Sequence, residues 1–169
     1  AGDESATAVK AAYQLWYGNK HLPPSPDLEP AWKAVKCVAA GDGKLSEAER
    51  AFLIGKMHAL HTPEPVIEAV LAFDVRSESP GKLLARLSVP TDARASLGAW
   101  IVYEALSVAL ADGEIATGEL DAVQRIAATM NVRSAVVDAL AEIVRDEAKL
   151  RDRRVAALRG STAAALLGE

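Results

Sequence analysis

Apolar residues recur along this chain at intervals of three and four, which is the spacing of residues on one face of an α-helix. Alanine and leucine, both strong helix formers, are abundant, and β-branched residues do not alternate with polar ones. The pattern therefore predicts an all-α fold, a bundle of about eight helices in a single domain that spans residues 1–169.

Glycine, proline and Asp-Gly pairs divide the apolar pattern into segments. The predicted helices span residues 6–17, 30–40, 46–60, 62–73, 82–87, 92–110, 117–130 and 134–159. Four prolines between residues 22 and 30 predict an extended connector, because proline lacks a backbone donor. Thr62 and Pro63 are expected as the N-cap and first residue of their helix. The tail, residues 160–169, is expected to fray.

The predicted helix 92–110 is apolar on nearly all sides, so we expect it at the centre of the bundle. Its most apolar run, from Leu97 to Ala111, is interrupted by Glu104 and is shorter than the ~20 residues that a bilayer crossing needs. We therefore expect a buried helix and no transmembrane segment.

An internal repeat appears when the chain is aligned with itself at a shift of 70 residues. Segments of about 32–74 and 102–146 then match without a gap in their hydrophobic and acidic classes, as in a duplicated helical unit. Asp42 falls on Asp112, and a glycine follows each aspartate at a sharp break between helices. The repeat predicts two pseudo-symmetric halves around one core.

Each Asp-Gly corner is followed by a glutamate, Glu49 in the first copy and Glu119 in the second. In the first copy, Ser46 and Glu49 form the Ser-x-x-Glu pattern of a capping box, whereas Ala116 replaces the serine in the second. Both glutamates also lie on the apolar stripe of their helices, where a carboxylate needs a backbone donor, a cation or a metal as its partner. Stabilisation of the helix start is the structural alternative to ligand binding.

The stretches Val38–Glu49 and Val108–Glu119 resemble the signature of the TerB-like family. This α-helical family is named for the tellurite-resistance protein TerB and includes the N-terminal domain of the co-chaperone DjlA. The resemblance covers residues 32–146. It implies a non-enzymatic helical module linked to stress response, whose acidic residues bind a divalent metal such as Ca²⁺, Mg²⁺ or Zn²⁺.

Carried over by position, the metal ligands would be Asp42 and Glu49 in one copy and Asp112 and Glu119 in the other. The chain departs from the usual pattern at Gly41, where alanine is normal. It also departs at residues 116–118, where a polar cap and a second glutamate are common.

Two other functions remain open. An enzyme or small-ligand-binding protein would use a cavity between the halves, lined by Trp32, Trp100, Tyr103 and Glu104. We expect Glu104 on a polar seam that reaches solvent; if it is buried instead, its pKa would rise and it could bind a cation or act as an acid. The third possibility is a purely structural interaction module.

Other candidate groups favour structural roles. An EF-hand is excluded because Lys44 and Ala48 interrupt its alternating oxygen ligands. His58 and His61 have the spacing of a metal pair, but His61 aligns with an asparagine and fits a helix C-cap. Cys37, the one cysteine, is expected to be a buried inert thiol.

Half of the residues are apolar, and the net charge is −4, with a pI of about 5.5. This charge argues against nucleic acid as a partner. The basic residues within 149–159 are predicted to lie at a solvated helix end rather than to bind an anionic surface. A single cysteine and no secretory signal predict a cytoplasmic protein, and we expect a protein partner, with a homodimer as one form of it.

Overall fold

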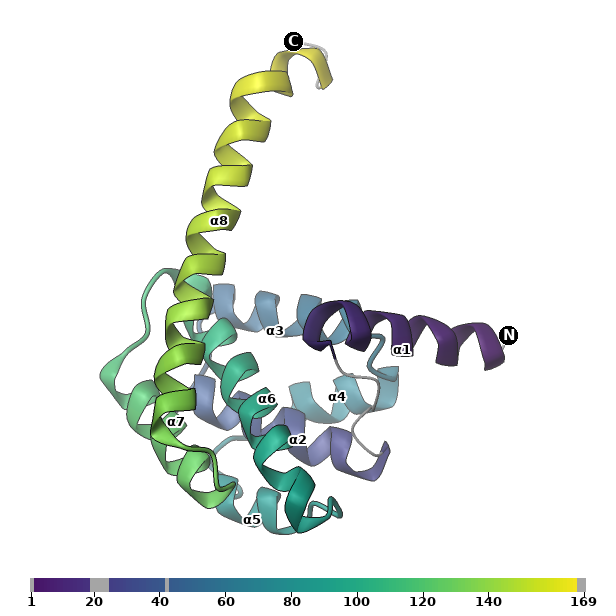
Figure 1. Cartoon of the computed structure of the whole chain (residues 1–169), viewed down its shortest axis with the longest axis vertical. Helices are drawn as coiled ribbons and strands as arrows, with labels where there is room; N and C mark the ends of the chain where they lie inside the picture. Colours follow the sequence, from purple (N-terminus) through teal and green to yellow (C-terminus); the bar gives the residue numbers. More distant parts are fainter. Residues whose placement is uncertain (1, 19–24, 42, 167–169) are drawn as a thin grey trace.

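A computed structural model describes residues 2–18, 25–41 and 43–166 of the chain. These residues form eight α-helices and one 3₁₀ turn and contain no β-strand, which confirms the predicted all-α fold (Figure 1). The elements are α1 (Gly2–Tyr17), α2 (Ser25–Ala39), α3 (Glu47–Ala59), α4 (Glu64–Ala72), α5 (Pro80–Ala85), α6 (Thr91–Ala109), η1 (Leu110–Asp112), α7 (Thr117–Thr129) and α8 (Ser134–Leu166).

Helix α6 occupies the centre of the bundle, as its apolar sequence predicted, and it contacts α2, α3, α7 and α8. Ten of its residues are buried. The stretch Thr91–Asp112 is long and apolar enough to cross a membrane by length and composition, and 56% of its most apolar window is buried inside the protein. Core helices commonly have this composition because they are covered on all sides.

Helix α2 begins at Ser25, so the predicted extended connector is wrong from that residue onward, and residues 22–24 lie outside the described part. Pro26 lies in the first turn, where its missing donor costs nothing. The fully buried Asp27 accepts hydrogen bonds from the Ser88 backbone nitrogen at 2.7 Å and from the Ser88 hydroxyl at 2.9 Å. This tertiary contact supports a helix that includes Pro30, against the local preference of proline.

Helix ends differ from the predictions at three other places. Helix α1 starts at Gly2, and α8 continues to Leu166, whereas fraying was expected from residue 160. Alanine and leucine near the end of α8 favour its extension. Helix α4 begins at Glu64 with no side-chain cap, so Thr62 does not act as the predicted N-cap.

The same backbone conformations recur 70 residues apart. Gly43 and Gly113 have φ of 111° and 115°. His61 and Asn131 have φ of 54° and 59°, a left-handed conformation that ends a helix and fits the C-cap role expected of His61. The hydrogen bonds that accompany these ends also correspond: Thr62 donates to Met57 at 2.9 Å, and Val132 donates to Ala127 at 2.8 Å. These correspondences support the predicted duplication.

The end of α2 and the start of α7 make a close backbone contact. A Cβ atom added to Gly41 would lie 2.9 Å from the Glu119 nitrogen and 2.9 Å from the Gly118 carbonyl carbon. Alanine at residue 41 would therefore clash with backbone atoms. Both departures from the family motif, Gly41 and Gly118, thus meet at one place, where they let the two corners approach each other.

We predict that Gly41→Ala destabilises the fold by about 1–3 kcal/mol, because its methyl group would force the two backbones apart. Gly55→Ala is the matched control. Gly55 lies within α3 with open space at its Cβ position, so alanine there should stabilise the protein by about 0.5–1 kcal/mol. Urea unfolding measures both changes, and equal effects of the two variants would contradict the contact.

Candidate functional site

Glu49 and Glu119 are held by backbone donors at the starts of α3 and α7. The Ser46 backbone nitrogen donates to Glu49 Oε2 at 2.6 Å, and the Ser46 hydroxyl accepts from the Glu49 nitrogen at 3.2 Å. This is the predicted capping box. The Ala116 nitrogen donates to Glu119 Oε2 at 2.6 Å, so the second copy keeps the glutamate half of the box without a serine.

The two glutamates meet, and we call them the carboxyl pair. Glu49 is 4% exposed and Glu119 is 8% exposed, and the two side chains lie close enough for Glu49 to raise the pKa of Glu119. Burial raises the pKa of Glu119 to about 7; the Ala116 nitrogen opposes this rise, and Glu49 and the negative charge of Asp112 add to it. With this pKa, Glu119 holds a proton in about half of the molecules at pH 7.

Of the four predicted metal ligands, the structure brings Glu49 and Glu119 together. Asp112 is near enough for its charge to affect Glu119, and Asp42 lies outside the described residues. Among the residues that the structure describes, no group of three or more His, Cys, Asp or Glu side chains could hold a metal ion. The described donors are thus two carboxyl groups from two different helices.

The donor chemistry of the carboxyl pair fits a hard cation. One oxygen of each carboxyl group accepts a backbone N–H, which leaves the other oxygen for a ligand. Mg²⁺ and Ca²⁺ take oxygen ligands and complete their coordination with water, whereas structural Zn²⁺ sites use four ligands, mostly sulfur and nitrogen. Glu49 and Glu119 therefore suit Mg²⁺ or Ca²⁺ better than Zn²⁺.

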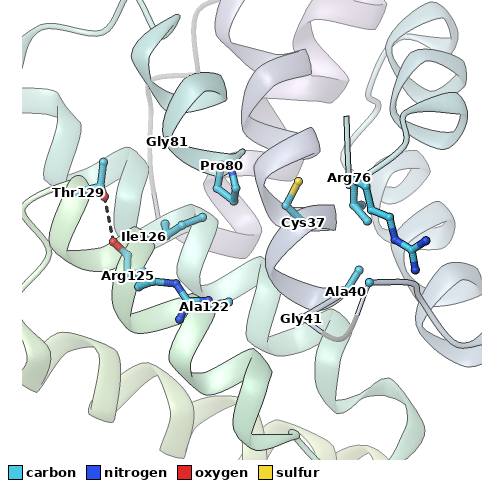
Figure 2. A pocket seen from close by; sticks show the side chains of 12 residues that line it. Cys37, Ala40, Gly41, Arg76, Pro80, Gly81, Ala122, Arg125, Ile126 and Thr129 are labelled. Carbon is cyan, nitrogen blue, oxygen red and sulfur yellow. Dashed lines mark hydrogen bonds between the residues drawn. The ribbon is translucent and has the colours of Figure 1, made fainter. Parts of the chain in front are cut away.

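A pocket of about 460 Å³ lies beside the same corner and is lined in part by Gly41 and Cys37 (Figure 2). Arg76 and Arg125 line it from opposite sides of the α2 end, so their guanidinium groups do not converge on one point. Burial raises the pKa of the Cys37 thiol to about 11. The thiol is therefore protonated at neutral pH, in agreement with the expectation of an inert buried cysteine.

Glu104 is fully buried, so the predicted polar seam that reaches solvent is wrong. Tyr17 donates a hydrogen bond to Glu104 Oε1 at 2.5 Å, and Lys56 Nζ lies 3.6 Å from the same oxygen. The Lys56 ammonium also lies 4.0 Å from the centre of the Trp16 ring and 5.4 Å from that of Tyr103. Burial raises the pKa of Glu104 to about 7 even though Lys56 and Tyr17 lower it.

Of the four residues predicted to line a cavity, Trp32, Trp100 and Glu104 form packed contacts. The rings of Trp32 and Trp100 meet edge to face with centroids 4.9 Å apart, and Trp32 is fully buried. Tyr103 donates to Glu147 at 2.8 Å and lines a groove of about 500 Å³, but Trp32, Trp100 and Glu104 do not line it.

Lys56 pairs with Glu104 inside the fold, and this role was not predicted from the sequence. It lies three residues after Leu53 on the buried side of α3 and is 8% exposed. A lysine on the apolar stripe of an amphipathic helix was therefore the available signal, since lysine is almost never buried without a partner.

The sequence matches no protein-family model, and no curated protein matches it with significant similarity. Among solved structures, the chain is similar to a tellurite resistance protein from Nostoc punctiforme, with a TM-score of 0.77 over 95% of this chain and 97% of that chain. The two sequences are 23% identical, so the similarity shows the fold. The fold is that of the TerB-like tellurite-resistance proteins, as the Asp-Gly motif predicted.

We predict that Lys56→Met destabilises the protein by roughly 3 kcal/mol at pH 8, because it leaves a buried carboxylate without its cation. The loss should be smaller at pH 6. Without Lys56 the pKa of Glu104 rises further above its unfolded value, so the folded state holds a proton that the unfolded state has released, and stability falls as pH rises.

Lys149→Met is the control for this prediction. Lys149 pairs with Asp146 at 2.9 Å, but both side chains are more than 70% exposed, so its removal should cost less than about 0.5 kcal/mol at either pH. Thermal unfolding at the two pH values measures the difference. A Lys56→Met cost that does not change with pH would contradict the buried ion pair.

Proposed function

We propose that this chain is a non-enzymatic TerB-like module that binds a divalent cation, Mg²⁺ or Ca²⁺, at the carboxyl pair of Glu49 and Glu119. The observation that carries the proposal is the proximity of these two buried side chains, which come from different helices. Two neighbouring carboxylates repel each other when both are ionised, unless a positive charge lies with them. A proton supplies that charge at low pH, and a divalent cation supplies it when the proton is lost.

The carboxyl pair is already held in place, so a cation could bind without a rearrangement of the two side chains. The backbone nitrogens of Ser46 and Ala116 already fix one oxygen of each carboxyl group. A cation held by the other two oxygens would join the starts of α3 and α7 and would replace repulsion between the carboxylates by attraction. Asp112, and Asp42 by the family resemblance, are further candidate ligands at the same corners.

The proposed biological setting is suggested by the name of the similar structure and by the composition. The similar structure is named a tellurite resistance protein, and we propose a role of the same stress-response type for this chain, in the cytoplasm and through a protein partner. Cation binding would act by changing the stability of the contact between the two corners. That contact includes the Gly41 backbone, which also lines the neighbouring pocket.

The alternative of an enzyme with a cavity between the halves has less support. Its predicted lining residues Trp32 and Glu104 are fully buried, and Glu104 is already paired with Lys56 and Tyr17. A carboxylate with these partners has little access to a substrate. Binding at the carboxyl pair is therefore the function that the geometry favours.

Isothermal titration calorimetry with Mg²⁺, Ca²⁺ and Zn²⁺ tests the proposal. At pH 8 we expect the wild type to bind Mg²⁺ or Ca²⁺ and Glu119→Gln to lose at least tenfold in affinity, because a neutral amide cannot replace the carboxylate. At pH 5.5 the wild type should bind more weakly, since the pKa of Glu119 is about 7 and protons then compete with the cation. At pH 7 the measured heat of cation binding should differ between buffers of different ionisation enthalpy, because the proton that the cation displaces is taken up by the buffer.

Glu68→Gln is the matched control because Glu68 is exposed and lies on α4, a different helix from those that carry the carboxyl pair. It should bind as the wild type does. Asp42→Asn and Asp112→Asn test the remaining predicted ligands and should weaken binding if these residues complete the site. No heat with any cation at pH 8, or equal binding by wild type and Glu119→Gln, would contradict the proposal.

A further inference from the structure

Helix α8 extends well beyond the rest of the bundle (Figure 1). Its first part packs on the core through Val137, Ala141 and Val144, but every residue from 152 to 160 is exposed. Four large apolar side chains of α8 are exposed to solvent: Ile143, Leu150, Val155 and Leu158, with exposures of 47%, 57%, 38% and 61%. A solvated helix end would not need this apolar surface, which is typical of a helix that has a partner.

A groove of about 500 Å³ lies at the base of this extension, between α8 and α3. Its apolar lining includes Trp16, Phe52 and Leu150, and Arg151 and Arg154 line it from α8. Leu158 lies one helical turn after Arg154, on the same side of α8. The apolar surface of the extension is therefore continuous with the groove.

The charges of α8 are divided along its length. Residues 142–147 carry a net charge of −2, whereas residues 149–159 carry a net charge of +4. In an antiparallel pair of α8 helices, the basic part of each copy would lie on the acidic part of the other. A parallel pair would place like charges together. The helix is thus complementary to a second copy of itself in one orientation.

We propose that two copies of this chain associate through α8, with the two helices antiparallel and crossing between Leu150 and Arg151. In this register Glu147 lies opposite Arg154 of the second copy, and Ile143 lies opposite Leu158 of the second copy. The extension of each helix covers the groove beside α3 of the other copy. This inference is independent of cation binding because it uses other residues.

A charge-swap experiment on the full chain tests this register by sedimentation velocity. Wild type should dimerise, and Glu147→Arg and Arg154→Glu should each raise the dimer dissociation constant at least tenfold, because each single change opposes like charges twice. The double variant should recover dimerisation. A mixture of the two single variants should form heterodimers, since both symmetric pairs are then restored.

Cross-linking supplies a second readout. Leu150→Cys should form a disulfide-linked dimer on mild oxidation because the two copies of residue 150 lie next to the crossing point, and the native Cys37 is buried. Asp121→Cys, at an exposed residue of α7, should not. A monomer at all attainable concentrations, or a dimer unaffected by the charge changes, would overturn the proposal. So would a monomeric chain that binds phosphatidylserine vesicles through α8.

Discussion

The structure depends on one constraint: two buried glutamates share a small space where the ends of two Asp-Gly corners meet. The Glu49–Glu119 contact exists because the backbone at Gly41 lies against that of Gly118 and Glu119, with no room for a Cβ atom on Gly41. Backbone donors at both helix starts hold the carboxyl groups in place. The arrangement favours a nearby positive charge, which a proton on Glu119 supplies and which a divalent cation supplies in our proposal.

Glu104 is also buried, but its partners lie inside the fold. Glu104 has Lys56 and Tyr17 as internal partners, and three aromatic rings surround the lysine. Its charge is therefore balanced within the fold, and it ties α1 to α3 and α6. The carboxyl pair has no such described cation, and this difference makes it the better candidate for an external ligand.

Much of the fold could be predicted because helix periodicity and Asp-Gly breaks are local signals. The start of α2 could not, because the buried contact of Asp27 with Ser88 overrides the local preference of proline. Glu49 and Glu119 were identified singly as candidate ligands, but their meeting depends on how the halves pack. Gly41 is required by that packing, and Gly118 lies at the same contact. In the sequence alone, however, they are only departures from the usual motif. Burial of Glu104 was missed because its partner Lys56 comes from another helix.

The most direct test is an NMR titration of the glutamate carboxyl carbons in the cation-free protein. The account predicts that Glu119 titrates near pH 7 and that Glu49→Gln moves its pKa towards the ordinary value of 4.5, while Glu104 continues to titrate near 7. Added Mg²⁺ or Ca²⁺ should lower the apparent pKa of Glu119 in the wild type. A pKa of Glu119 near 4.5 in the wild type would contradict the account, because it would show that Glu119 is not held in a buried site beside Glu49.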